Sequence, residues 1–411
     1  MEFRDYQLEI IDKGVDVIKK YDFVYLAMEV RTGKTLTSLG ICDKLGATNV
    51  LFVTKKKAIG SIEGDHKMFN PKFAISVINY ESLHKIDVVN QIFDVVILDE
   101  AHGLGAFPKK SKRCDSIRRL VAISKAKVIL LSGTPTPESY SQIYHQVNFI
   151  PKNPFKQFVN FYKFAQKYVD VKQRKINSFF INDYSCGKKE ILDIMKPYMI
   201  SYSQKEAGFV VQTDEEILYV DIKQETRGLI RKITKDLVIE GKDEVVLADT
   251  PVKLMTKVHQ LCSGTIKFES GRSMVVDYTK AEYICEKFKN QKIGIFYKFK
   301  EELAALKKVF DDDLCTDLET FNSTSKSIAL QIVSGREGIS LRKAEALVYY
   351  NIDFSATSYW QSRDRMTTKD RLHNKIYWVF SKGGIEDDIY KAVVKKKDYT
   401  LNHFKKDLLN L

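Results

Sequence analysis

The sequence predicts an α/β protein made of two domains, each built on a parallel sheet. The chain has 411 residues, and a length of this order suits two domains of about 200 residues better than one compact core. Short apolar runs typical of buried strands alternate with segments of helical periodicity along nearly the whole chain. Hydrophobic residues make up 44% of the chain, so both domains have enough apolar side chains to form a core.

The amino-acid composition indicates which kinds of binding partner and which cellular environment to expect. The formal net charge of +13 favours a polyanion, although a basic balance alone is unspecific. The longest apolar runs are far shorter than the roughly 20 residues that span a bilayer, so no membrane partner is expected. The six cysteines are scattered without a Cys-x-x-Cys pair, so we expect neither a zinc site nor a disulfide framework, and a reduced, cytoplasmic location. The oligomeric state stays open, and a monomer is compatible with the sequence.

The first predicted strand leads into a candidate phosphate-binding loop. Residues 23–27 are apolar and β-prone, Gly-Lys-Thr occupies 33–35, and a helical pattern follows. Backbone N–H groups at such a helix N-terminus point at an anion. Lys34 would then reach the β- and γ-phosphates of ATP, and the Thr35 hydroxyl would hold Mg²⁺. Because Met28 stands where the full pattern has its first glycine, a simple surface turn is the alternative.

A second candidate site follows the predicted strand at 93–98. This strand contains four consecutive apolar residues and is followed by Asp99 and Glu100, which indicates a strand buried on both faces. Burying two carboxylates without a partner is costly. A Mg²⁺ ion held by Asp99 would remove that cost, and Glu100 would orient or deprotonate the attacking water. The alternative is that Asp99 only caps a helix, which the nearby phosphate loop disfavours.

Polar residues also follow the strands predicted at 49–54 and 73–80. Ligands of parallel α/β sheets bind at the carboxyl ends of the strands. Thr54, Lys55 and Tyr80 lie at such ends and are candidate ligand contacts, although lysines there are commonly just solvated.

Two stretches of the first domain leave alternatives open, and a third ends in a polar turn. Residues 2–20 are predicted to form an amphipathic helix, in which Gln7 is either a surface residue, as sequence physics alone favours, or a reader of an adenine edge. The basic stretch 107–119 is either a solvated loop or a contact to phosphates. The strand predicted at 127–131 ends in a polar turn with hydroxyl side chains.

In their order along the chain, these motifs resemble those of a superfamily-two helicase, and within it the Swi/Snf-like branch that includes small phage-type helicases. The matching strings of the first domain are Tyr6-Gln7, Gly33-Lys34-Thr35, Val53-Thr54-Lys55, Asn79-Tyr80-Glu81-Ser82-Leu83, Asp99-Glu100-Ala101-His102 (a DEAH box) and Ser132-Gly133-Thr134-Pro135. In the second domain, residues 292–297, 334–341 and 359–366 resemble motifs IV, V and VI.

The resemblance implies two RecA-like domains in tandem, at 1–205 and 206–411, with a helical, aromatic-rich insert at about 148–205. The aromatic residues of the insert are expected to be mainly core residues, with base stacking as the alternative. Residues 210–216 are expected to form an acidic turn, and residues 222–263 to form helices interrupted at Gly241 and Pro251. A phage-type protein would act in the cytoplasm of a bacterial host.

The resemblance also implies ATP and Mg²⁺ as cofactors and DNA as a partner, bound largely through its phosphates. ATP would lie in a cleft between the domains and be completed by arginines of the second. The sequence of motif VI differs from the family pattern at one of its two arginine positions. Arg365 fits the first arginine, four residues after Gln361, but Thr368 stands at the second position, so Arg371 or Arg363 would have to replace it.

The expected function is that of an ATP-dependent DNA helicase or translocase. An RNA helicase and a nucleic-acid-binding protein with a weak ATPase are the alternatives. The expected catalytic residues are Lys34, Asp99, Glu100, Arg365 and Arg371, and the expected metal ligands are Thr35 and Asp99. The expected nucleotide contacts are Gln7, Arg31, Thr32, Gly33, Lys34, Thr35, Gly338 and Gln361. The expected nucleic-acid contacts are Thr54, Lys55, Tyr80, Ser334 and Arg336.

Overall fold

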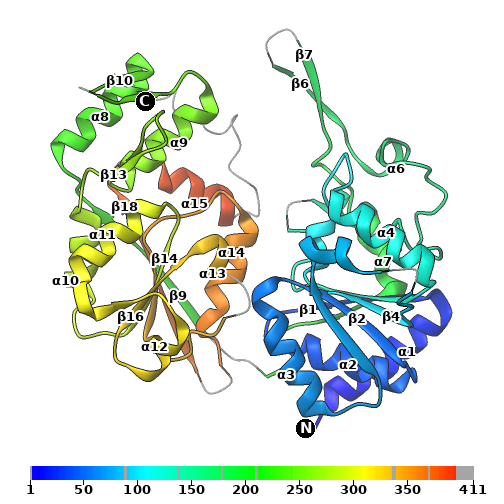
Figure 1. The fold of residues 1–411 in the computed structure, drawn as a ribbon. Helices are drawn as coiled ribbons and strands as arrows, with labels where there is room; N and C mark the ends of the chain where they lie inside the picture. Colours follow the sequence, from blue (N-terminus) through cyan, green and yellow to red (C-terminus); the bar gives the residue numbers. More distant parts are fainter. Residues whose placement is uncertain are drawn as a thin grey trace. The chain divides into compact units, whose positions relative to one another are not determined.

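The fold consists of two compact units, residues 1–209 and 210–411, for which the sequence predicted a boundary at 205. The computed structural model describes residues 2–87, 90–137, 139–176, 179–208, 212–241, 243–335, 339–368 and 371–394. Each unit contains a six-stranded sheet with helices on both faces (Figure 1). This arrangement confirms the predicted α/β class with two parallel sheets in tandem.

The sheet of the first unit has six parallel strands in the order β3–β2–β4–β5–β1–β8. Its strands are β1 (Phe23–Met28), β2 (Asn49–Thr54), β3 (Ala74–Asn79), β4 (Val95–Leu98), β5 (Lys127–Leu131) and β8 (Met199–Tyr202). The first five match the strands predicted from apolar runs. The sixth, β8, was not predicted, because the chain returns from the insert to pair with β1.

Two helical layers cover this sheet. Alternate residues of β1 show why both are needed, because Val24 and Leu26 pack into one hydrophobic cluster and Phe23 and Tyr25 into the other, all with no exposed surface. One layer contains α1 (Asp5–Tyr21), α2 (Lys34–Lys44) and α3 (Ile59–Phe69). The other contains α4 (Lys112–Ser124), α5 (Ile143–Val147), α6 (Phe161–Tyr168) and α7 (Glu190–Met195).

The insert contains helices, as predicted, and also an antiparallel hairpin. The hairpin pairs β6 (Lys172–Ile176) with β7 (Phe179–Asp183) and extends away from the body of the unit (Figure 1). Several aromatic side chains of the insert are buried in the core of the first unit: Phe155, Phe161, Phe164 and Tyr168. For these residues the interpretation as core side chains is confirmed.

The sheet of the second unit has six parallel strands in the order β15–β16–β14–β17–β18–β9. Its strands are β9 (Gln212–Val220), β14 (Ile293–Tyr297), β15 (Leu314–Cys315), β16 (Ser327–Gln331), β17 (Ala346–Tyr349) and β18 (His373–Ser381). Helices α10 (Thr279–Lys287) and α11 (Lys300–Phe310) cover one face. The other face packs against α8 (Gln224–Asp236), α9 (Pro251–Cys262), α12 (Leu318–Ser323), α13 (Ile332–Gly335), α14 (Ala356–Arg363) and α15 (Glu386–Val394).

One local prediction in the second unit was wrong. Residues 212–216, expected in a turn, belong to β9, which pairs with β18 along the whole length of both strands. This long-range pairing outweighs the low strand propensity of acidic residues. Residues 222–263 form two helices with an interruption between them, as predicted at Gly241 and Pro251. The short hairpin of β10 (Val238–Glu240) and β11 (Val245–Leu247), which was not predicted, lies between α8 and α9, and α9 begins at Pro251.

Short elements complete the described chain. A hairpin of β12 (Thr265–Lys267) and β13 (Ser273–Val275) follows α9. The 3₁₀ turns are η1 (Lys56–Ala58), η2 (Tyr80–Lys85), η3 (Ala101–Leu104), η4 (Tyr140–Gln142), η5 (Lys196–Tyr198), η6 (Asp311–Asp313) and η7 (Asp364–Met366). Within the described ranges, no helix is both long and apolar enough to cross a bilayer.

Gly264 provides a test of backbone packing between α9 and β12. Its φ is +78°, and a Cβ added there would lie 2.2 Å from the carbonyl oxygen of Asp277. Gly271, in the turn of the next hairpin, has a φ of +91° but no atom within 4 Å of an added Cβ. We expect Gly264→Ala to lower the free energy of unfolding by about 2–4 kcal/mol and Gly271→Ala by only about 1 kcal/mol. Chemical denaturation measures both, and equal losses would contradict the clash.

Candidate functional site

The predicted phosphate loop lies between β1 and α2, at the carboxyl edge of the first sheet. Gly33 caps α2 with a φ of +81°, a left-handed conformation that glycine adopts at little cost. The ammonium group of Lys34 donates to the carbonyl oxygens of Met28, at 2.9 Å, and Glu29, at 3.1 Å. The lysine therefore folds back over the end of β1, which is where its charge would meet a phosphate held by the loop.

Gln7 is part of this loop's support and not a surface residue, so the surface interpretation was wrong. Its side chain is 3% exposed. Its amide nitrogen donates to the carbonyl oxygen of Gly33, at 3.3 Å, and to the hydroxyl of Thr37, at 3.2 Å. Its amide oxygen accepts from the backbone N–H of Arg4, at 3.0 Å. Contact with an adenine edge stays a prediction for this residue.

The other loop residues differ in exposure. Thr32 is fully buried, and its hydroxyl donates to the carbonyl oxygen of Glu29, at 2.7 Å, so it shapes the loop from inside. Arg31 and Thr35 are partly exposed. Thr35 lies in the first turn of α2, and its role as a ligand of a phosphate-bound metal ion stays a prediction.

Residues that follow β8 hold the loop from its other side, and sequence reasoning missed them. The backbone N–H of Gln204 donates to the carboxylate of Glu29, at 2.8 Å, and its side-chain amide donates to the carbonyl oxygen of Val30, at 3.0 Å. Glu29 also donates its N–H to the carbonyl oxygen of Tyr202. Since these residues are more than 170 positions apart, no local pattern could have identified Gln204.

Asp99 lies at the carboxyl end of β4 and is held by the neighbouring strand ends. The Thr54 hydroxyl donates to its carboxylate at 2.7 Å, and the backbone N–H of Glu100 donates to the other carboxylate oxygen at 3.0 Å. The Tyr80 hydroxyl donates to its backbone carbonyl oxygen at 2.6 Å. Burial, followed by the charge of Glu100, raises the pKa of Asp99 to about 6. Burial and the neighbouring charge make the ionised form of Asp99 unfavourable, and a bound cation would offset that cost.

Glu100 and the Ser-Gly-Thr-Pro turn are linked through His102. Nδ1 of His102 lies 3.3 Å from the Glu100 carboxylate and 3.0 Å from the Ser132 hydroxyl. A Cβ added to Gly133 would lie 3.6 Å from the ammonium nitrogen of Lys34, so this turn approaches the phosphate loop closely. The structure thus brings together the three predicted motifs of the first unit.

The candidate nucleic-acid contacts of the first unit divide into two kinds. Thr54 has no exposed surface and Tyr80 is 6% exposed, and both hydroxyls bond Asp99. Thr54 holds the carboxylate of Asp99 and Tyr80 holds its backbone carbonyl oxygen, and a contact of either residue with nucleic acid stays a prediction. Lys55 is partly exposed at the start of η1. In the basic stretch 107–119, residues from Lys112 onward belong to α4 and not to a loop, and the exposed Arg113 pairs with Glu81. A contact of this stretch with phosphates stays a prediction.

The candidate arginines of the second unit have different surroundings. The guanidinium of Arg365 donates to the carbonyl oxygen of Ile339, at 3.3 Å, and that of Arg363 pairs with Glu215, at 2.8 Å. Arg371 differs from both because its guanidinium donates to four backbone carbonyl oxygens, those of Arg342, Ala344, Glu345 and His373. These bonds fix the approaches to β17 and β18, so they give Arg371 a structural role and favour Arg365 as the catalytic candidate.

The remaining predicted contacts of the second unit are only partly described. Ser334 lies in α13 and Gln361 in α14. Arg336 and Gly338 lie outside the described residues.

The donor set of the first unit fits a nucleotide with its magnesium ion. Among the described residues, no group of three or more His, Cys, Asp or Glu side chains could hold a metal by itself. Mg²⁺ bound to a nucleotide needs only one or two protein ligands, because phosphates and waters complete its octahedron. Thr35 and Asp99 match that requirement.

The fold and this edge of the first sheet define a tandem RecA-like protein of helicase superfamily two. The chain matches the family model of the SNF2-related domain over residues 29–277, which is more than half of its length. The chain belongs to this family, as its motifs predicted.

Curated relatives are similar over most of this chain. A "SWI/SNF-related matrix-associated actin-dependent regulator of chromatin subfamily A-like protein 1" of Xenopus tropicalis is 20% identical over 78% of this chain and 35% of its own length. The Drosophila melanogaster protein of the same name is 20% identical over 80% of this chain and 44% of its own length. The chain thus spans less than half the length of these relatives. Among solved structures, a Sulfolobus solfataricus SWI2/SNF2 ATPase core in complex with dsDNA aligns with 99% of this chain and 92% of its own, at 15% identity and a TM-score of 0.44.

Removal of the Asp99 charge tests the raised pKa. In the folded protein without nucleotide, ionisation of Asp99 costs stability as the pH rises from about 4 to about 6, because its folded pKa lies above the usual value of about 3.9. We expect Asp99→Asn to be more stable than the parent by about 1–2 kcal/mol at pH 8, by roughly half as much at pH 5 and by little below pH 4. Thermal unfolding at several pH values measures the difference, and a gap that does not change with pH would contradict the assignment.

Thr54→Val separates support of Asp99 from contact with DNA. Valine keeps the shape of the side chain and removes the hydroxyl that bonds Asp99. We expect kcat for ATP hydrolysis to fall about tenfold, equivalent to about 1.4 kcal/mol, while the affinity for DNA changes less than twofold. Thr54→Ser, which keeps the hydroxyl, is the control and should retain most activity. A loss of DNA affinity with unchanged hydrolysis would instead make Thr54 a nucleic-acid contact.

Proposed function

We propose that this protein is a DNA-dependent ATPase that couples ATP hydrolysis to movement along DNA or to its remodelling. The observation that carries the proposal is the meeting of Lys34, Asp99 and Glu100 at one edge of the first sheet, with Asp99 held in place by two neighbouring strand ends. Membership of the SNF2-related family supports the coupling to DNA. The chromatin-related names belong to relatives of which the match to this chain covers less than half, so the substrate of this chain is part of the proposal.

Each residue has a role that follows from its position. Lys34 neutralises the phosphates of the nucleotide, and Thr35 and Asp99 hold the magnesium ion that supplies charge stabilisation at the transferred phosphoryl group. Glu100 orients the attacking water or accepts its proton. The link from Glu100 through His102 to Ser132 gives the carboxylate a fixed orientation and connects it to the next motif.

A second function is favoured by the departure in motif VI. Thr368 replaces the second arginine, and Arg371 is bonded to four backbone carbonyl oxygens. A protein that lacks one catalytic arginine would bind nucleic acid but hydrolyse ATP slowly, since such a residue contributes about 10³–10⁵ in rate.

The experiment that decides is ATP hydrolysis by the full chain in the presence of single-stranded DNA, duplex DNA or RNA. The proposal requires stimulation of many-fold by DNA and none in Lys34→Ala. A larger response to duplex than to single strands favours a translocase over a helicase, and a response to RNA alone identifies an RNA helicase. Nucleic-acid binding without hydrolysis identifies the second function.

Substitutions of two arginines of the second unit distinguish a catalytic role from a role in stabilising the fold. We expect Arg365→Ala to lower DNA-stimulated kcat by about 10³ or more with little change in the melting temperature. We expect Arg371→Ala to lower the free energy of unfolding by roughly 2–3 kcal/mol, because it leaves several backbone carbonyl oxygens without a donor. Steady-state hydrolysis and thermal unfolding of both variants test this, and the reverse pattern would make Arg371 the catalytic arginine.

A further inference from the structure

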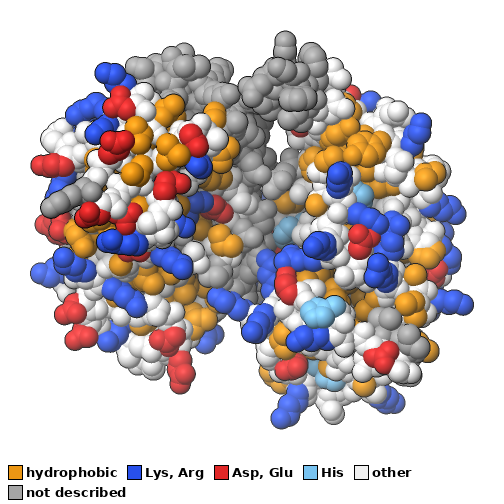
Figure 2. Space-filling model, turned by 45° about the horizontal axis from the view of Figure 1, so that its top comes forward, with side chains coloured by type: hydrophobic (Ala, Val, Ile, Leu, Met, Phe, Trp, Pro, Cys, Tyr) orange, Lys and Arg blue, Asp and Glu red, His pale blue; other side chains and the backbone are white. Residues whose placement is uncertain are grey.

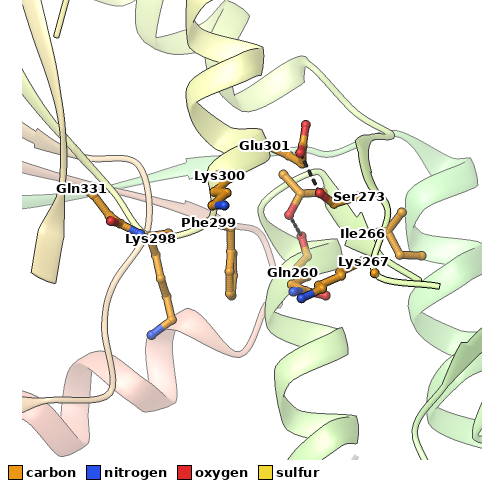
Figure 3. Close-up of a pocket in the computed structure, with 11 residues that line it drawn as sticks. Gln260, Ile266, Lys267, Ser273, Lys298, Phe299, Lys300, Glu301 and Gln331 are labelled. Atoms are coloured by element: carbon orange, nitrogen blue, oxygen red, sulfur yellow. Dashed lines mark hydrogen bonds between the residues drawn. The ribbon is translucent and has the colours of Figure 1, made fainter. Parts of the chain in front are cut away.

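The second unit contains a cavity of about 350 Å³ that none of the predicted site residues line. It lies where β14 and β16 end, between the start of α11, the last turn of α9 and the β12–β13 hairpin (Figure 3). Carboxyl ends of parallel strands are where open α/β sheets bind ligands. The volume falls in the lower part of the range of about 300–1,000 Å³ found for small-molecule sites, which is enough for one nucleoside-sized group.

Gln260 is a buried polar side chain that the fold leaves unsatisfied. It lines the cavity and is 8% exposed. Its side-chain oxygen is buried and has no hydrogen-bond partner among the described residues, while its backbone carbonyl oxygen accepts from Ser263 and Thr265. Because an unpaired buried acceptor lowers stability, a ligand that brings a donor to this amide would be favoured.

Phe299 forms an aromatic wall of the same cavity. Its ring lies between the side chains of Lys298 and Gln260 (Figure 3). It packs edge-to-face against the buried ring of His259, with centroids 5.3 Å apart. This contact fixes the orientation of the ring, and a fixed aromatic ring is the platform on which nucleic-acid bases stack.

The charges around the cavity favour an anion at its rim. The lining contains three lysines and one carboxylate. Lys298 is paired with Asp353, but Lys267 and Lys300 are exposed and form no ion pair with the part of the chain that the structure describes. The face of the second unit in Figure 2 shows lysine and arginine side chains scattered over its surface, so the cavity is distinguished by its amide and its aromatic ring rather than by charge alone.

We propose that this cavity receives a single unpaired base of a DNA strand. The base stacks on Phe299, its polar edge bonds the Gln260 amide, and its flanking phosphates lie near Lys267 and Lys300. A glutamine amide presents one acceptor and two donors, the combination that matches a base edge. A base inside a duplex is stacked on both faces, so only an extruded or single-stranded nucleotide can enter. The inference rests on the proposed function and adds that the DNA substrate contains at least one unpaired nucleotide.

The test compares three DNA probes with the full-length protein. One duplex carries a single extrahelical 2-aminopurine, a second has the same 2-aminopurine paired with thymine, and the third probe is the single strand. We expect the extrahelical and single-stranded probes to bind about tenfold more tightly than the paired duplex. We also expect the fluorescence of the extrahelical 2-aminopurine to fall on binding as the base stacks. Equal affinities and unchanged fluorescence would overturn the inference.

Matched variants locate the base. Phe299→Leu keeps an apolar side chain and should abolish the fluorescence change and most of the preference for unpaired nucleotides. Gln260→Met should reduce the same preference without loss of thermal stability, since it removes an acceptor that has no partner. Lys300→Gln should weaken binding of the unpaired probes more than Lys307→Gln, which removes the same charge from an exposed position in the last turn of α11. Equal effects of the two lysine variants, or a marked destabilisation by Gln260→Met, would contradict the assignment.

The outcomes separate this inference from the proposed function. If duplex DNA stimulates hydrolysis and all probes bind alike, the proposed function holds and the cavity is not a base site. If no DNA probe binds and no nucleic acid stimulates hydrolysis, both fail.

Discussion

The first unit depends on how Asp99 is held. Its carboxylate is partly buried beside that of Glu100, and its pKa is raised to about 6. The Thr54 hydroxyl partly offsets this cost by donating to the carboxylate, and the Tyr80 hydroxyl fixes the backbone by donating to the carbonyl oxygen of Asp99. These donors come from the ends of β2 and β3, and the sheet order β3–β2–β4 is what places both beside Asp99. Because its ionised form is unfavourable, Asp99 would be stabilised by a bound cation. Because its position is fixed by hydrogen bonds, it would also position that cation.

The same edge of the sheet explains why the insert belongs to the first unit. After about fifty residues of helices and hairpin, the chain returns as β8 and pairs with β1. Glu29 and Val30 then bond Tyr202, the last residue of β8, and Gln204, which follows it, so the phosphate loop is held by the sheet on one side and by the end of the insert on the other. Changes in the loop on nucleotide binding would therefore reach the insert directly.

The second unit uses arginine and glutamine for different purposes. Arg371 donates to four backbone carbonyl oxygens where β17 and β18 begin, and its planar fork suits such multiple bonding better than a lysine would. Gln260 differs from Arg371 because its buried side-chain oxygen has no hydrogen-bond donor among the described residues. An arginine bonded to four backbone carbonyl oxygens indicates a structural role, whereas the unsatisfied amide oxygen beside the cavity is the basis for the ligand site that we propose.

The sequence by itself determined the parallel α/β class, the strands β1 to β5 and the positions of Lys34, Asp99 and Glu100, because each motif is contiguous with the apolar strand that precedes it. Only the tertiary structure decided that Gln7 is buried against the loop, that Thr54 and Tyr80 bond Asp99, and that residues 212–216 form a strand. It also revealed Gln204, the bonds of Arg371 and the cavity beside Gln260. These features join residues that are far apart in the chain. A hydrogen bond across such a distance depends on strand order and packing, which leave no periodicity in the local sequence.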